Sequence, residues 1–268
     1  MFYFLFSLLH KLIDRCIEWF IHKPIRIREE DFAVMNTERS RLVNIYTKNK
    51  EKISLVEIYP TKETMVNCNA SQKYLIYSHG NNGTILSKFS YFLNLSANLN
   101  ISIIAYDYIG YGLSENKLPT ETGCYDSLKC TIDYVVDLGA DFSNIYLMGR
   151  SLGTGVVIDY VSKNDWGTPI ILISPYKSIA TIILDTEFNI FYPIDKFRSV
   201  EKLKSVKCPA KIFHGEDDTV INISHGKNLY DNLPNKLFEP TWLKNIGHQR
   251  ILKMITIDHY QEIISNKN

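Results

Sequence analysis

The sequence predicts an α/β fold in which a mostly parallel central sheet is covered by helices on both faces. From about residue 53 onward, short apolar runs alternate with longer segments of helical periodicity. Most of these runs are nearly continuous, which is typical of strands that are buried on both faces. The 268 residues are 45% hydrophobic and 22% charged, an ordinary globular composition. At this length we expect one main domain.

The expected strands are short apolar runs, and the first of them alternates with period two. In chain order they span residues 53–59, 74–77, 101–106, 144–148, 169–173, 210–213 and 239–243. An expected helix follows each strand except the first and the one over residues 169–173. These helices span residues 86–99, 121–138, 152–162, 224–232 and 250–264. The connection between residues 173 and 210 is short, so we expect a small cap over the sheet or none.

Polar side chains with useful chemistry follow the carboxyl ends of these strands. Ligands bind at that edge of a parallel sheet, so its loops are the expected place of function. They contain His79-Gly80-Asn81, Asp107, Ser151, Asp217-Asp218 and His248.

Ser151 is the expected nucleophile, in Gly149-Arg150-Ser151-Leu152-Gly153 between a strand and a helix. In such a nucleophile elbow the turn is so sharp that a Cβ at the flanking positions would collide, which requires glycine. The following helix directs free N–H groups and its positive dipole end at developing charge. The alternative is an ordinary glycine-rich turn. Arg150 either forms an ion pair beneath the sheet or attracts an anionic group of the substrate.

A serine needs a base to become a good nucleophile, and His248 is the expected base. It lies in a short loop between the last strand and the last helix, after the acid, in the chain order typical of this elbow. His214 is a weaker candidate because it precedes the acid at a strand end. His79 is also weaker, since its His-Gly loop can form half of an oxyanion hole.

Two neighbouring carboxylates, Asp217 and Asp218, compete for the role of orienting the histidine. We favour Asp218 for its spacing from Gly215, and a turn or helix-capping role is the alternative for either residue. For the oxyanion hole we expect the backbone N–H groups of Leu152 and Asn81. The Asn81 side chain has the alternative role of capping the next helix.

With these motifs in place, the chain resembles the α/β hydrolase superfamily over about residues 50–265, and more closely the subfamily of α/β hydrolase domain-containing protein 17. The matching stretches are Ser78-His79-Gly80-Asn81, Tyr106-Asp107-Tyr108, Gly110-Tyr111-Gly112, Ser151-Leu152-Gly153-Thr154, Ser174-Pro175, His214-Gly215 with Asp218, Ser224-His225-Gly226 and Gly247-His248. The resemblance implies the α/β-hydrolase fold and a thioesterase that removes palmitoyl groups from protein cysteines at membranes. The chain departs from the subfamily at its N-terminus, where Cys16 replaces a cluster of cysteines.

The expected function is that of a serine hydrolase, which cleaves ester or thioester bonds through an acyl-enzyme. Ser151 attacks, His248 takes its proton, and Asp218 holds His248. We expect no metal or organic cofactor. The expected substrate is an acyl ester or thioester, including an acyl group on a lipidated protein. Two alternatives stay open: a serine peptidase of the same fold, and a catalytically inactive hydrolase fold that serves as an interaction surface.

We expect a separate N-terminal segment over residues 1–30, followed by the hydrolase domain over residues 31–268. The apolar residues of the N-terminal segment recur at helical spacing. They are Leu5, Leu9, Leu12, Ile13, Cys16, Ile17 and Phe20. Either this helix docks on the domain, or it lies in a membrane surface through its aromatic residues. These are Phe2, Tyr3, Phe4, Phe6, Trp19 and Phe20.

Charge and cysteine content indicate the setting of the protein. The formal net charge is +1, which gives no reason to expect a nucleic-acid partner. The five cysteines are scattered without metal-ligand spacing, so we expect reduced thiols and no metal site. The short apolar start has no basic residues before it and no cleavage site. We therefore expect a protein that is not secreted, located in the cytoplasm or peripherally on a membrane.

Overall fold

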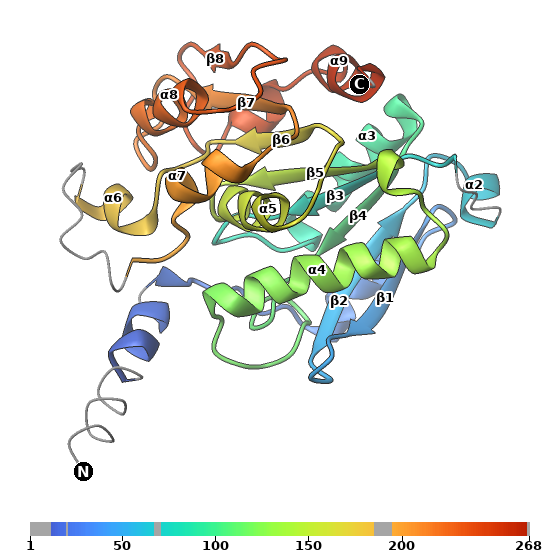
Figure 1. Cartoon of the computed structure of the whole chain (residues 1–268). Helices are drawn as coiled ribbons and strands as arrows, with labels where there is room; N and C mark the ends of the chain where they lie inside the picture. The colour runs from blue at the N-terminus through green and yellow to red at the C-terminus, as the bar shows by residue number, and fades with distance from the viewer. Residues whose placement is uncertain (1–11, 20, 67–70, 185–194, 267–268) are drawn as a thin grey trace.

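The structure is a computed structural model that describes residues 12–19, 21–66, 71–184 and 195–266. Within this part of the chain, eight strands form one sheet in the order β1-β2-β4-β3-β5-β6-β7-β8 (Figure 1). The strands are β1 (Ser40–Tyr46), β2 (Lys52–Ile58), β3 (Tyr74–Ser78), β4 (Ser102–Tyr106), β5 (Ile145–Arg150), β6 (Ile170–Ile173), β7 (Ala210–Gly215) and β8 (Thr241–Leu243). β2 pairs antiparallel with β1 and β4, and the other neighbours pair in parallel, so the expected mostly parallel sheet is confirmed.

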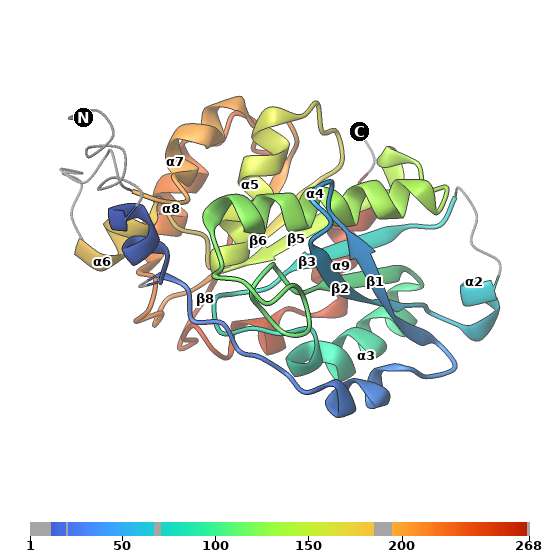
Figure 2. The ribbon, with the colours of Figure 1, turned by 90° about the horizontal axis from the view of Figure 1, so that it is seen from below.

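Helices cover both faces of the sheet, as Figure 2 shows from below. The α-helices are α2 (Lys62–Val66), α3 (Phe89–Leu99), α4 (Glu121–Asp137), α5 (Leu152–Lys163), α6 (Ile179–Leu184), α7 (Ser199–Lys202), α8 (Ile223–Asp231) and α9 (Ile257–Ser265). Short 3-10 helices are η1 (Glu29–Met35), η2 (Leu86–Lys88), η3 (Phe142–Asn144), η4 (Leu203–Ser205) and η5 (Ile251–Met254). One core cluster joins α4, α5 and α8 to the sheet, and a second joins α3 and α9 to the opposite face. Burial of these apolar side chains is the main force that holds the layers together.

The sequence interpretation missed the edge strand β1, because its residues alternate weakly and include Arg41 and Asn44. β1 pairs along its whole length with β2 and explains two buried polar residues there. Ser54 donates to Asn44 Oδ1 at 2.7 Å, and Glu57 accepts from the Arg41 guanidinium. The alternation of β2 therefore does not mark an exposed face, because all its residues after Lys52 are buried.

The predicted helix over residues 250–264 is in fact two elements, η5 and α9. Thr256 separates them by starting a new helix. Its side chain accepts a hydrogen bond from the backbone N–H of His259, and the His259 side chain accepts one from the N–H of Thr256. Such a reciprocal cap favours a helix start at this position over a continuous helix.

Between β6 and β7, the described residues form only α6, α7 and η4. α6 is the element of this connection that lies next to the pocket described below, and its sequence Ile-Ala-Thr-Ile-Ile-Leu is almost entirely apolar.

Residues 12–19 of the N-terminal segment are helical, and two acidic side chains of this helix bind the body. Glu18 is buried and accepts hydrogen bonds from the backbone N–H of Glu121, at the start of α4, and from His22. Lys196 forms ion pairs with Glu18 and Asp14. A carboxylate at a helix N-terminus is favourable because the helix dipole is positive there.

Three apolar side chains of the same helix are exposed, Leu12 at 60%, Ile13 at 41% and Trp19 at 68%, whereas Ile17 is partly buried. The other aromatic residues that the sequence suggested for a membrane surface lie outside the described residues. They are Phe2, Tyr3, Phe4, Phe6 and Phe20. No helix in the described part of the chain has the length and apolar character needed to cross a bilayer.

Four cysteines lie in the described residues, and all four are free thiols: Cys16, Cys124, Cys130 and Cys208. Cys68 lies outside the described residues. Nowhere in the described ranges do three or more His, Cys, Asp or Glu side chains gather in a way that could hold a metal ion.

Candidate active site

Ser151 occupies a strained turn between the end of β5 and the start of α5. Its backbone has φ 51° and ψ −120°, a conformation that costs a non-glycine residue on the order of 1–3 kcal/mol. The neighbouring strand and helix hold it there, since the Ser151 N–H donates to the Ile173 carbonyl at 2.9 Å and the Ser151 carbonyl accepts from Thr154 at 2.8 Å. The turn is thus the sharp strand-to-helix elbow that the sequence predicts.

The two glycines of the pentapeptide are required by close backbone packing. A Cβ on Gly149 would lie 2.4 Å from the Gly153 carbonyl oxygen. A Cβ on Gly153 would lie 2.1 Å from the Ser78 carbonyl oxygen, at the end of β3. Both clashes are with backbone atoms, which cannot rotate away as a side chain can. Glycine at these positions lets α5 start directly over the sheet.

His248 and Asp218 come together from the loops after β8 and β7. His248 Nδ1 lies 2.8 Å from Asp218 Oδ2. Asp218 Oδ1 accepts from the backbone N–H groups of Val220 and Ile221, at 3.0 and 2.8 Å. Burial alone would raise the pKa of Asp218, but the hydrogen bond and charge of His248 and the Ile221 N–H outweigh it, so the pKa is lowered. The carboxylate is therefore held ionised in a fixed position.

The neighbouring Asp217 is directed elsewhere. It is exposed, and its backbone N–H donates to the Ile246 carbonyl at 3.1 Å. Asp218, the carboxylate favoured from its spacing, is the one in contact with His248. The distinction depends on side-chain direction, which adjacent residues in a tight turn do not share.

The two other candidate histidines are buried, and neither lines the cavity that contains Ser151. His214 Nε2 lies 2.8 Å from the Ile221 carbonyl oxygen and 3.6 Å from Asp218 Oδ2, so it lies behind the acid. His79 Nδ1 contacts the Gly80 carbonyl oxygen at 2.8 Å. Burial lowers the pKa of both, that of His79 to about 4, so both are neutral near pH 7.

The backbone groups expected for an oxyanion hole lie beside Ser151. Leu152 is the first residue of α5, so its N–H has no acceptor within the helix. Asn81 follows Gly80 in a turn closed by a hydrogen bond from the Gly83 N–H to the Gly80 carbonyl, at 2.8 Å. This turn approaches the nucleophile closely, since a Cβ on Gly80 would lie 3.3 Å from Ser151 Cβ. Asn81 and Leu152 both line the pocket that contains Ser151.

The Asn81 side chain has a role that the sequence did not indicate, because it fastens the N-terminal segment to the body. Its Oδ1 accepts from the Lys23 N–H and from the Tyr111 hydroxyl, both at 2.8 Å, and its Nδ2 donates to the Ile21 carbonyl at 2.7 Å. Ile21 and Lys23 thereby form part of the pocket wall. No local motif connects residues this far apart in sequence.

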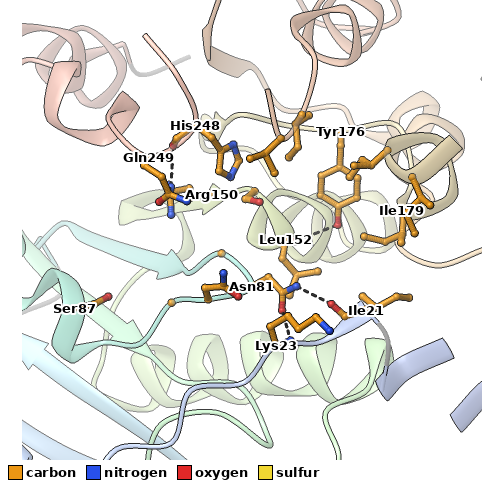
Figure 3. Close-up of a pocket in the computed structure, with 18 of the residues that line it drawn as sticks. Ile21, Lys23, Asn81, Ser87, Arg150, Leu152, Tyr176, Ile179, His248 and Gln249 are labelled. Carbon is orange, nitrogen blue, oxygen red and sulfur yellow. Dashed lines mark hydrogen bonds between the residues drawn. The ribbon is translucent and has the colours of Figure 1, made fainter. Parts of the chain in front are cut away.

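Ser151 and His248 open onto one cavity of about 440 Å³. Its lining divides by chemistry (Figure 3). In that view, Leu152, Tyr176, Ile179 and Ile21 lie on one side, and Arg150, Gln249 and Ser87 on the other. We call these sides the apolar lobe and the polar lobe. Ile182, Ile183, Val220 and Ile221 add to the apolar lining, and Asn82 and Lys88 to the polar lining.

Arg150 lies in the polar lobe without an acidic partner. Within the described residues, no carboxylate lies at ion-pair distance from its guanidinium, so the ion pair beneath the sheet, one of its two possible roles, is not formed. Instead, Nη2 donates to the His248 carbonyl at 2.9 Å and to Gln249 Oε1 at 3.3 Å. Arg150 thus contacts the same loop that carries the histidine.

Several known proteins are similar to this chain. An α/β hydrolase of Acanthamoeba polyphaga mimivirus is 47% identical over 265 residues, which covers 98% of each chain. The human α/β hydrolase domain-containing protein 17C is 34% identical over 189 residues, 69% of this chain and 56% of the human protein. The solved esterase Pf2001 of Pyrococcus furiosus aligns with a TM-score of 0.69 at 17% identity, over 91% of this chain and 98% of the esterase. No protein-family model matches the sequence.

Proposed function

Because this chain belongs to the α/β hydrolase family, we propose that it is a serine hydrolase that cleaves ester or thioester bonds through an acyl-enzyme. One observation carries the proposal. A serine in a nucleophile elbow and a histidine paired with a buried carboxylate open onto the same cavity. Neither the serine in its elbow nor the histidine–carboxylate pair needs the other for an evident structural purpose.

The proposed first step is attack of the Ser151 hydroxyl oxygen on the acyl carbonyl carbon. His248 donates its Nδ1–H to Asp218, which leaves the lone pair of Nε2 available to take the serine proton. Asp218 stabilises the imidazolium that forms, and its own two N–H partners keep it in place. The strained backbone of Ser151 holds the hydroxyl clear of the sheet for this attack.

The carbonyl oxygen becomes negatively charged in the tetrahedral intermediate. We assign its stabilisation to the N–H groups of Leu152 and Asn81. Collapse of the intermediate breaks the bond to the alcohol or thiol, which leaves with the proton from His248. Water, deprotonated by His248, then attacks the acyl-Ser151 ester and releases the carboxylic acid. The lining of the cavity by Ile179, Ile182 and Leu152 suits an aliphatic acyl chain.

The proposed substrates include acyl groups on lipidated proteins, as the likeness to the domain-containing protein 17 subfamily implies. The matched region spans 56% of the human 17C protein, so its activity is carried over only as a proposal. The exposed Leu12, Ile13 and Trp19 suit peripheral contact with a membrane, where such substrates reside. Co-sedimentation with phosphatidylcholine vesicles, compared between the natural chain and Trp19→Ala, tests this contact.

A fluorophosphonate probe tests the serine-hydrolase proposal directly. We expect covalent labelling of the natural chain and none of Ser151→Ala, followed by Ser151-dependent hydrolysis of octanoyl esters or thioesters. Absence of both activities would refute the proposal and favour an inactive interaction fold. Labelling together with cleavage of peptides alone would favour a peptidase.

A further inference from the structure

The guanidinium of Arg150 is an unusual feature of the cavity, because it is buried and charged but has only neutral acceptors. Arg150 is 8% exposed, and its described hydrogen-bond partners are the His248 carbonyl, the Gln249 side-chain oxygen and the Tyr77 hydroxyl, all of them neutral. Nε is buried and has no hydrogen-bond partner among the described residues. Removing a cation from water is costly unless an anion or several hydrogen bonds replace the lost solvation. The guanidinium therefore carries its charge at the edge of the cavity without an anion among its described partners.

The rest of the polar lobe adds positive charge and no compensating negative charge. Lys88 lines the same cavity, and none of the described residues that line it is Asp or Glu. Burial lowers the pKa of Lys88, and the charges of Arg150 and Lys253 lower it further. Arg150 and Lys88 thus reinforce each other's potential within one lobe. An anion that enters it would relieve this repulsion.

We propose that the polar lobe binds a carboxylate or phosphate on the leaving group of the substrate, with Arg150 and Lys88 as its cations. The inference rests on the proposed hydrolase function and names its substrate class. The apolar lobe takes the acyl chain, so the group beyond the scissile bond points toward Arg150 and Gln249 (Figure 3). A guanidinium beside the nucleophile suits this role, because its planar donors match both oxyanions.

Thioesters with the same acyl chain and leaving thiols of different charge separate the effect of charge from that of chemical reactivity. We would measure kcat/KM for octanoyl thioesters of 3-mercaptopropionic acid, its neutral amide and cationic thiocholine, whose quaternary nitrogen cannot take the acyl group. We expect the anionic thioester to exceed the neutral one by about tenfold or more, the discrimination of one charge-assisted hydrogen bond. The cationic thioester should be slowest. A second pair, 1-octanoylglycerol and 1-octanoylglycerol 3-phosphate, distinguishes a phosphate preference from a carboxylate preference.

Variants assign the preference to the two cations. Arg150→Gln and Lys88→Gln should each lower the ratio of kcat/KM between anionic and neutral thioesters severalfold. Arg150→Lys keeps the positive charge, so it should lower this ratio less than Arg150→Gln does. It also keeps the test possible if Arg150→Gln does not fold. Lys207→Gln is the matched control, because its side chain is 77% exposed and does not line the cavity. Its ratio should stay within about twofold of the natural chain.

The outcomes distinguish this inference from the function on which it rests. Equal Ser151-dependent hydrolysis of all three thioesters would overturn the anion site and leave the hydrolase intact. An equal loss on every substrate in Arg150→Gln, with Lys88→Gln unchanged, would mean that Arg150 only supports the His248 loop, and would also overturn it. Absence of hydrolysis in every case would instead count against the proposed function.

Discussion

His248 Nδ1 and Asp218 Oδ2 lie 2.8 Å apart, although 30 residues separate them in the chain. Parallel pairing of β7 with β8 brings them together, because Gly215 lies opposite Leu243 and the two following loops leave the sheet side by side. The carboxylate is fixed from its other side by two backbone N–H groups. The histidine orientation thus depends on the sheet and on a single side-chain contact.

Asp218→Asn should therefore cost far more activity than Asp217→Asn. The amide cannot stabilise the imidazolium and favours the wrong tautomer of His248, so we expect kcat to fall by about 10⁴-fold. Asp217 carries the same charge as Asp218 but is exposed, so kcat of Asp217→Asn should stay within about twofold of the natural chain. Steady-state kinetics on an octanoyl thioester checks both. A larger loss in Asp217→Asn would mean that His248 changes its partner on substrate binding.

Gly153→Ala should destabilise the protein strongly, since its Cβ would meet the Ser78 carbonyl oxygen at 2.1 Å. We expect a loss of at least about 3 kcal/mol in the free energy of unfolding, from urea denaturation. Gly167→Ala is the matched control, because nothing lies within 4 Å of its added Cβ. That variant should change stability by less than about 1 kcal/mol. Equal effects would show that α5 shifts easily over β3.

Asn81→Ala should release the N-terminal segment from the pocket wall. The Lys23 amide loses its acceptor and the Ile21 carbonyl its donor, so amide exchange at Lys23 should become faster by about tenfold or more. KM should rise more than kcat falls, because the backbone N–H of residue 81 remains. Asn98→Ala, at an exposed site on α3, is the control for hydrogen exchange. Unchanged exchange at Lys23 in Asn81→Ala would contradict this role of the side chain.

The pH dependence of stability should carry a contribution from Asp107, which is fully buried beside His79. Burial raises its pKa from the usual 3.8 to about 7, although N–H groups of Ile85 and Leu113 oppose the shift. The raised pKa means that the folded state prefers the protonated form. This contribution to stability is complete below pH 4 and is lost as pH rises through 7.

The difference in melting temperature between the natural chain and Asp107→Asn checks this sign. Asn cannot ionise, so any constant cost of the substitution is independent of pH. The natural chain should therefore lose stability relative to Asp107→Asn between pH 5 and pH 8. A constant difference across that range would show that Asp107 stays ionised throughout.

Much of the site was predictable because its signals are local. The elbow around Ser151 needs two glycines within five residues, and the strand before it is a plain apolar run. Loops at the carboxyl ends of parallel strands meet at one edge, which indicated His248 and Asp218. The edge strand β1 was not predictable in this way, because an edge strand with Arg41 and Asn44 has no clear apolar pattern. Thr256 divided a helix that periodicity alone had joined.

By itself, the sequence determined the mostly parallel α/β fold and Ser151 in its elbow, because backbone sterics and hydrophobic burial act over a few neighbouring residues. Only the tertiary structure decided which aspartate meets His248, that Ile21 and Lys23 form part of the pocket wall, and that Arg150 lies without a carboxylate. These are contacts between segments distant in the chain. They depend on side-chain direction and on the packing of whole elements, which no local pattern encodes.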